Sequence, residues 1–250
     1  MSINLLDRVL LNIPDEPTLM PGSSGFTLPE GVWIPQAWVA LLSMDVISEK
    51  ALLDIWEPLI KYIPNAVEKI SRHTMQVALA VYPGDETGIS LLYAFQVVLE
   101  EEQAVTWEKQ DLILAWSAGC PATDEDIANA ESRLNITLPQ SYKNFVRVHN
   151  GFNLYPLDTG PRSLDNLFFI SKYRDWVQES GYQLDKLLAF SGDGAGNEQC
   201  YNLMAQLSDE DYLTYDWDHE THQITKPRTF WDYLEQFFAR EMRNAQVREN

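Results

Sequence analysis

The sequence predicts an α+β protein, in which an antiparallel sheet packs against helices and a smaller α/β region precedes it. Three observations support this fold class. The segments that begin at Thr123 and Thr229 have capped starts and the apolar spacing of amphipathic helices. The runs "QCYNLM", "DYLTYDW" and "HQITK" are separated by turn residues, as the strands of an antiparallel meander are. The run "MQVALAVYP" is typical of a buried strand.

The first part of the chain contains a proline-rich stretch followed by helices and strands. Prolines recur through residues 14–37 with "GSSG" between them, so this stretch is expected to be mostly loop. Helices are expected around 45–57 and 65–74, separated by Pro58 and Pro64. After "MQVALAVYP" and the turn "GDETG", the run "ISLLYAFQVVLE" is expected to return as a second strand, although its periodicity also permits a helix.

The stretch "SAGCPAT", Ser117 to Thr123, marks a change in the pattern. Its small residues, with one glycine and one proline, are typical of a linker. We therefore predict a domain boundary near residue 119, between an N-terminal region of unknown type (1–119) and a second domain (120–250). No internal repeat is visible in either part.

Two helices are expected at the start of the second part. Thr123 and Asp126 have the spacing of a capping box. Pro139 is expected at the first position of the next helix, where its missing N–H costs nothing. Gly151, after Asn150, is expected to take a left-handed conformation and close this helix. The residues expected to face the core at helical spacing are Tyr142, Phe145, Val146 and His149.

A further capped helix is expected near the end of the chain. Thr229 and Asp232 are its predicted capping pair, and Arg240 and Arg243 lie near its C-terminus, where positive charge is favoured. The residues of its predicted buried face are Trp231, Leu234, Phe238 and Met242.

The protein is strongly acidic. It has 18 Lys and Arg against 37 Asp and Glu, a formal net charge of −19, and the excess is present in both parts of the chain. Such a field repels phosphate backbones and anionic lipids, so direct binding of nucleic acid or membrane is not expected. It would speed encounter with a basic protein, or simply keep the protein soluble.

Cysteine content and hydropathy predict a cytoplasmic protein. Only Cys120 and Cys200 are present, which gives no disulfide framework and fits a reducing compartment. The N-terminal run "MSINLLDRVLLNIPDEP" has no basic n-region, and no stretch approaches the length of an apolar membrane helix.

Two short motifs resemble ligand sites but lack what the chemistry needs. "GDGAGN" at 192–197 is followed by a predicted strand, whereas a dinucleotide-binding loop is followed by a helix, so glycines of a hairpin loop are the preferred interpretation. "HETH" at 219–222 spaces its histidines three apart rather than the four of a helical zinc motif, so a turn is preferred. Cys200 has no positive neighbour in the sequence to activate it. We therefore predict no catalytic residue, no metal and no cofactor.

An acidic and aromatic cluster, "SDEDYLTYDWDHE" at 208–220, is the strongest candidate for partner binding. Aromatic anchors surrounded by carboxylates suit the recognition of a cationic protein, although the aromatic rings are also compatible with a core position. Together with the rim of the glycine-rich loop, the predicted partner-binding residues are Asp193, Asn197, Glu198, Asp209, Glu210, Asp211, Tyr215, Asp216, Trp217, Asp218 and Glu220.

Residues 123–240 resemble the SUKH superfamily, which includes fungal cell-wall-synthesis regulators and bacterial immunity proteins. Four pieces in order carry the resemblance: the acidic first helix leading into "LPQSYKNFVRVHNG", then "LLAFSGDGAGNEQCYNL", "DWDHE" and "TFWDYLEQF". The residues of these pieces expected to be structural are Pro139, Tyr142, Phe145, Asn150, Gly151 and Trp231. Met204 departs from the family, which often has an aspartate at this position. The resemblance covers about half of the chain and does not extend to residues 1–115.

The resemblance implies a non-enzymatic protein-binding module. The leading hypothesis is an immunity-type inhibitor that covers the basic active site of a bacterial polymorphic toxin. The rival is a regulatory scaffold of the cell-wall-synthesis-regulator type, and a weaker third is an enzyme that uses the glycine-rich loop. The sequence leaves the identity of the partner and the oligomeric state open.

Overall fold

The computed structural model describes residues 17–82, 88–97, 112–155, 159–175, 177, 181–243 and 245–248. The elements of the first part are β1 (Thr18–Pro21), α2 (Gln36–Leu42), α3 (Glu49–Ile60), α4 (Pro64–His73), β2 (Gln76–Val81), β3 (Ile89–Val97) and β4 (Leu112–Gly119). The elements that follow are α5 (Asp124–Leu134), α6 (Gln140–Val146), β5 (Phe152–Tyr155), β6 (Gly160–Pro161), η1 (Leu164–Asn166), β7 (Phe168–Phe169), η2 (Ile170–Tyr173), η3 (Leu184–Lys186), β8 (Leu187–Gly192), β9 (Glu198–Ser208), β10 (Asp211–Trp217), β11 (Ile224–Arg228) and α7 (Phe230–Glu241).

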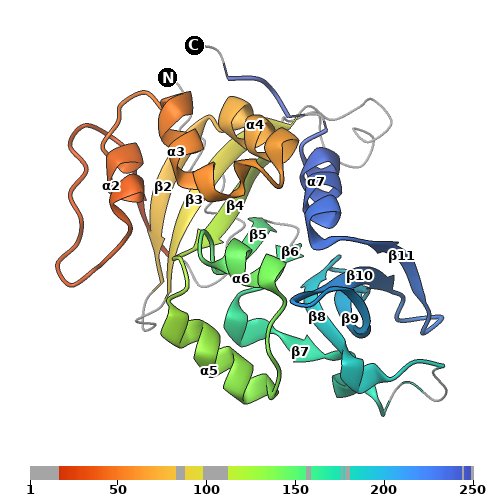
Figure 1. The fold of residues 1–250 in the computed structure, drawn as a ribbon. Coiled ribbons are helices and arrows are strands. Elements are labelled where there is room, and N and C mark those ends of the chain that lie inside the picture. Colours follow the sequence, from red (N-terminus) through yellow and green to blue (C-terminus); the bar gives the residue numbers. More distant parts are fainter. Residues whose placement is uncertain are drawn as a thin grey trace.

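Two antiparallel sheets organise these elements, which confirms the predicted α+β class (Figure 1). The first sheet has the order β1-β2-β3-β4-β5, and α3 and α4 lie across it. The second has the order β11-β10-β9-β8-β6, with β7 also paired to β8. The predicted strand "ISLLYAFQV" is indeed β3, and β8 to β11 form the predicted meander. Residues 84–87 of the predicted turn and 98–100 of the predicted strand lie outside the described residues.

The predicted capping boxes are present at both helices. In α5, the Thr123 side chain accepts from the Asp126 N–H while the Asp126 carboxylate accepts from the Thr123 N–H. Thr229 and Asp232 make the same reciprocal pair at the start of α7. These contacts join residues three apart, so they depend on local sequence alone.

Several helix predictions need correction. Helix α2 lies partly within the stretch expected to be loop, because Pro35 takes the position that precedes it and Trp38 is buried in the core. Pro58 does not separate two helices but lies in the last turn of α3, which ends at Ile60. Pro139 is the residue before α6 rather than its first residue.

The positive φ predicted for Gly151 is present, but its predicted role in closing a helix is wrong. Gly151 has φ +91°, whereas α6 ends at Val146 and the following Arg147 keeps a right-handed conformation. Gly151 instead lets the chain turn into β5. A Cβ atom there would come within 2.9 Å of the Ser163 nitrogen. Trp231, predicted to be buried, is half-buried and stacks on Tyr62 with 4.4 Å between ring centroids.

The stretch predicted as a linker is partly strand, and packing crosses it. β4 continues to Gly119 and pairs with β5, so one sheet contains strands from both sides of residue 119. The largest core cluster also combines side chains from both sides. The Trp56 ring lies 4.6 Å from the His149 ring and 5.2 Å from the Phe152 ring, between centroids. The division into 1–119 and 120–250 stays a prediction.

Helix α7 and the segment after it return to the first part of the chain. The Glu235 carboxylate accepts from the N–H groups of Asn65 and Ala66, and so caps the start of α4. Beyond α7, the Gln246 N–H donates to the Gln96 carbonyl at 2.8 Å, and the Arg248 N–H donates to the Arg72 carbonyl at 3.0 Å. Among the helices of the described segments, none has the length and apolar character needed to cross a membrane.

Candidate functional site

The end of the β9–β10 hairpin combines exposed apolar and acidic side chains. Met204 and Leu207, on the distal part of β9, are 63% and 50% exposed. Asp209 and Glu210 form the turn and are also exposed. These four residues are referred to below as the hairpin tip. Exposed apolar side chains with a polar rim are typical of protein-interaction sites.

An irregular register explains why these apolar side chains face solvent. β9 and β10 pair regularly from Trp217↔Glu198 to Thr214↔Tyr201, but the register shifts between Thr214 and Tyr212. Within this irregular part, the Met204 N–H donates to the Asn202 side-chain oxygen at 3.0 Å. A bulge of this kind bends a strand and redirects its side chains. Simple alternation therefore does not predict which residues of distal β9 are buried.

Asp211 fixes the base of the tip. Its Oδ1 accepts from the Ser141 hydroxyl of α6 at 2.8 Å and from the Tyr212 N–H at 3.0 Å. The Gln140 N–H donates to the Glu210 carbonyl at 2.8 Å. Asp211 was predicted to contact a partner, but these bonds make it a group that positions the hairpin against the start of α6.

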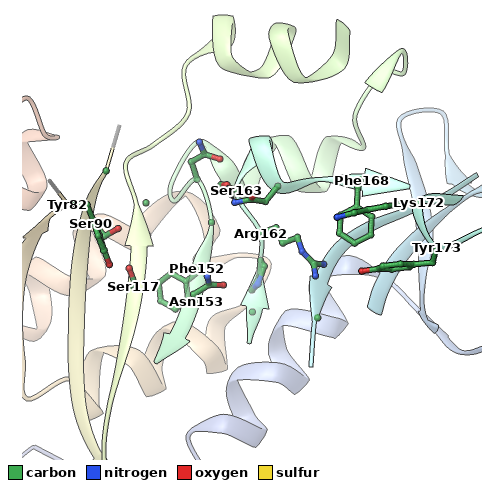
Figure 2. Close-up of a pocket in the computed structure, with 18 residues that line it drawn as sticks. Tyr82, Ser90, Ser117, Phe152, Asn153, Arg162, Ser163, Phe168, Lys172 and Tyr173 are labelled. Carbon is green, nitrogen blue, oxygen red and sulfur yellow. Dashed lines mark hydrogen bonds between the residues drawn. The ribbon is translucent and has the colours of Figure 1, made fainter. Parts of the chain in front are cut away.

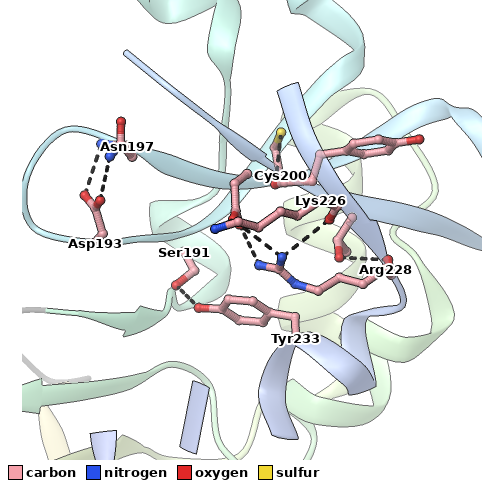
Figure 3. Close-up of polar contacts among 10 residues, drawn as sticks. Ser191, Asp193, Asn197, Cys200, Lys226, Arg228 and Tyr233 are labelled. Carbon is pink, nitrogen blue, oxygen red and sulfur yellow. Dashed lines mark hydrogen bonds and ion pairs between the residues drawn. The ribbon is translucent and has the colours of Figure 1, made fainter. Parts of the chain in front are cut away.

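The aromatic anchor predicted at Trp217 needs correction. Trp217 is 2% exposed and stacks on Tyr173, with 5.7 Å between ring centroids, inside a second core cluster on sheet β8–β11. Tyr215 is half-buried and packs against the same cluster. Asp216 is paired with Arg228 and Lys226 (Figure 3). Strand alternation turns Trp217 inward, so its ring is not available to a partner.

The glycine-rich loop and the "HETH" turn are connected to each other. Asp193 accepts from the Ala195 and Asn197 N–H groups, and the Asn197 amide donates to Asp193 (Figure 3). The Asn197 oxygen in turn accepts from the His219 N–H at 3.1 Å. Gly194 and Gly196 have φ +74° and +102°, as a hairpin loop requires. These bonds hold Asp193 and Asn197 at the surface of a closed loop.

The turn at 218–222 has its own internal bonds. Asp218 Oδ1 accepts from the N–H groups of Glu220 and Thr221, and these backbone bonds hold the pKa of Asp218 below its usual value. Glu220 is exposed, and His222 adopts φ +56°. No group of three or more metal-ligating side chains occurs within the described part of the chain.

Glu198 is buried rather than at the rim where it was predicted. Its Oε2 lies 2.8 Å from Arg162 Nη1, and the Tyr173 hydroxyl donates to its Oε1 at 3.1 Å. Burial raises the pKa of Glu198 above its usual value, and the nearby Arg162 partly opposes this. The pair fixes Arg162 beside a cavity that the sequence did not predict.

This cavity of about 1000 Å³ lies where the two sheets meet (Figure 2). One wall comes from the ends of β3 and β4, with Ser90 and Ser117, and from Asn153 of β5. The opposite wall comes from Arg162, Phe168 and the η2 segment. The other residues of the lining are Tyr82, Gly88, Gly119, Asn150, Gly151, Phe152, Gly160, Pro161, Ser163, Asn166, Lys172, Tyr173 and Gly192.

Comparison with known protein families identifies the family of the second part of the chain. Residues 121–240 match the family described as SMI1 / KNR4 family (SUKH-1). This part of the chain belongs to that family. Its members are in general protein-interacting modules without catalysis. Among curated proteins, none matches the chain.

The SUKH part begins just after β4 and includes α5, α6, the second sheet and nearly all of α7. All of the predicted partner-binding residues lie within it. The structure brings Asp209 and Glu210 together with two residues that sequence reasoning missed, Met204 and Leu207. The acidic cluster at 208–220 predicts the charged half of this surface, whereas nothing in the sequence pattern predicts that Met204 and Leu207 are exposed beside it.

Cys200 and His149 of the SUKH part are buried, and Cys120, which directly precedes this part, is half-buried. Burial raises the pKa of the Cys200 thiol far above its usual range, and that of Cys120 to about 11. His149 is fully buried among aromatic rings, and burial lowers its pKa to about 3, although a backbone contact with Gly119 partly opposes the shift. Thiols held protonated are poor nucleophiles.

Proposed function

We propose that this protein is a non-enzymatic protein-binding module of the immunity type. It would neutralise a bacterial polymorphic toxin by covering the toxin's basic active site. The hairpin tip is the observation that carries this proposal, because it joins exposed apolar area to unpaired negative charge. Asp209 and Glu210 have no ion-pair partner among the described residues.

Charge and apolar contact would act at different stages of binding. The net charge of −19 would steer a basic partner toward the protein and raise the association rate. Met204 and Leu207 would then be buried and would slow dissociation. Toxins that act on nucleic acid need a basic active site, so an acidic inhibitor presents charge of the same sign as their substrate.

A second candidate function is a regulatory scaffold that binds two proteins. The observation that favours it is a separate exposed apolar group before α2. Trp33 is 71% exposed, and Leu28 also lies on the surface nearby in the sequence. In this alternative the first part of the chain would contact one partner and the SUKH part another.

The test begins with capture of the partner by the full-length protein from its native cells, followed by mass spectrometry. The purified partner is then used for binding kinetics at several salt concentrations. We expect Asp209→Lys with Glu210→Lys to slow association and to weaken or reverse the salt dependence. We expect Met204→Ser with Leu207→Ser to speed dissociation by roughly tenfold.

A matched control makes the same charge change elsewhere. Glu57→Lys with Asp185→Lys alters two exposed carboxylates outside the tip, so its effect on association should be smaller. Inhibition of the partner's toxicity in cells that express both proteins would support the immunity type. A partner whose binding ignores the tip variants but is lost with Trp33→Ser would reject the tip and favour the scaffold.

A further inference from the structure

The described lining of the cavity between the two sheets presents basic side chains, although the protein as a whole is acidic. Among the described residues, the lining contains Arg162 and Lys172 but no Asp or Glu, in a chain with 37 acidic and 18 basic residues. Glu198 compensates the charge of Arg162 at 2.8 Å, so Lys172 supplies the positive charge of this lining that has no ion-pair partner among the described residues. The cavity volume of about 1000 Å³ is in the range of small-molecule sites, about 300–1,000 Å³.

Both cations are placed against one aromatic ring. The guanidinium carbon of Arg162 lies 4.9 Å from the centroid of Phe168, and Lys172 Nζ lies 4.7 Å from it (Figure 2). The buried Glu198 holds Arg162 through the 2.8 Å ion pair and leaves its other N–H groups available. Lys172 has no carboxylate partner within the described part of the chain.

The opposite wall offers hydroxyl groups. Ser117 is only 7% exposed, yet its hydroxyl makes no hydrogen bond to any described residue. Ser90, on the neighbouring strand, lines the same wall and is also without a side-chain bond in the described segments. A hydroxyl group that faces a cavity and has no protein partner is free to bond to a polar ligand.

We propose that this cavity binds a small organic anion that also carries hydroxyl groups, such as a sugar phosphate or a sugar acid. The anionic group binds between Arg162 and Lys172, and the hydroxyl groups of the ligand bond to Ser117 and Ser90. This site is separate from the hairpin tip, and the proposal does not rest on partner binding. Sugar phosphates and sugar acids both carry one anionic group together with several hydroxyl groups.

The test uses the full-length ¹⁵N-labelled protein and three probes: ribose 5-phosphate, glucose 6-phosphate and glucuronate. Binding is measured by calorimetry, and the site is located by the shifts of the amide signals of Gly119, Gly151 and Gly160, which line the cavity. We expect at least one probe to bind and to shift these signals. Comparison of the two sugar phosphates with glucuronate shows whether the site prefers a phosphate or a carboxylate.

Two substitutions and a matched control identify the contacts. Lys172→Gln should weaken binding of that probe by about tenfold or more, because it removes a charge-assisted hydrogen bond. Ser117→Ala should weaken the same probe but leave binding of inorganic phosphate unchanged. The control is Lys61→Gln, since Lys61 lies over Tyr62 at 4.6 Å in the same way but outside the cavity.

The outcomes separate clearly. Stronger binding of the probe than of inorganic phosphate, lost with Lys172→Gln and kept with Lys61→Gln, would support the proposal. Failure of all three probes to bind would overturn it, as would shifts confined to amides outside the lining. Equal binding of inorganic phosphate and the sugar phosphates would overturn the role of the hydroxyl wall.

Discussion

Two aromatic clusters of the molecule differ in how far apart their residues lie in the sequence. The cluster around Trp56 joins rings from both sides of residue 119, including His149, Phe152 and Phe238. The cluster around Trp217 uses only residues of the SUKH part, such as Tyr173 and Cys200. Both tryptophans are buried, so burial alone does not distinguish them. The difference is that the Trp56 cluster needs both parts of the chain, whereas the Trp217 cluster needs one.

The strongest test of this difference is a fragment of residues 120–250. It would lose Trp56 and β4 from the larger cluster but keep the whole Trp217 cluster. We expect it to lose the cooperative transition of the full chain, as measured by circular dichroism during heating. A cooperative transition near the full-length melting temperature would instead support the predicted boundary near residue 119.

Replacing each tryptophan compares the clusters within the intact chain. Trp56→Ala should cost about 3–5 kcal/mol of the free energy of unfolding, because it opens a cavity between the two parts. Trp217→Ala should cost less, because Trp217 lies in a smaller cluster beside half-buried residues. Urea unfolding of the two variants measures the difference. Equal costs would mean that the contacts across residue 119 add little stability.

His149 makes the larger cluster sensitive to acid. Its pKa is lowered by burial from an ordinary 6.5 to about 3, so the neutral form is favoured in the folded state. Its contribution to stability is therefore complete above pH 6.5 and is lost as the pH falls from 6.5 toward 3. Between pH 7 and pH 5 we expect a loss of about 2 kcal/mol from this group.

The measurement is urea unfolding at pH 7, 6 and 5. The matched variant is His149→Phe, which keeps an aromatic ring but cannot take up a proton. Its stability should fall less steeply with acid than that of the wild type. Parallel curves for both proteins would show that other groups cause the acid response.

Gly151 tests the turn that leads into the larger cluster. Gly151→Ala should cost more than the roughly 1–2 kcal/mol of a left-handed conformation, because its Cβ would also approach Ser163. Gly31→Ala is a control with φ +81° and open space around the Cβ position, so it should show the conformational cost alone. Thermal unfolding of both variants separates the two contributions. Equal losses would remove the steric argument at Gly151.

The smallest effect on stability is expected at the hairpin tip. Asp209→Lys with Glu210→Lys changes exposed side chains without ion pairs, so unfolding should shift by less than about 0.5 kcal/mol. Urea unfolding checks this before any binding experiment. A larger loss of unfolding free energy would mean that the tip contributes to the stability of the fold. Slower association of this variant with a partner would then reflect its lower stability rather than its changed charge.

Local patterns in the sequence predicted the elements whose contacts are local. The capping boxes at Thr123 and Thr229 and the order of β8 to β11 are confirmed, because each depends on residues a few positions apart. The pairing of β4 with β5 was missed, since the intervening chain includes two helices and no periodicity records the pairing. Helix α2 was missed because the prolines before it indicated loop.

The candidate sites show the same limit. The sequence identified Asp209 and Glu210 but placed the aromatic anchor at Trp217, because alternation alone does not say which face of a strand is buried. Met204 and Leu207 were missed, since the register shift in β9 breaks the alternation that would have predicted their exposure. The cavity was also missed, because Ser117 and Arg162 meet only through the packing of two sheets.

The bonds of Gln246 and Arg248 to the first part of the chain set an order for folding during synthesis. The ribosome completes β1 to β4 long before it makes these residues or β5. The β4 edge of the first sheet therefore stays unpaired until β5 has emerged, and the Arg72 and Gln96 carbonyls lack these partners until residues 246–248 have emerged. Contacts between residues this far apart form slowly and leave strand edges open to other chains. The growing chain is thus exposed to aggregation until β5 and residues 246–248 have taken their places.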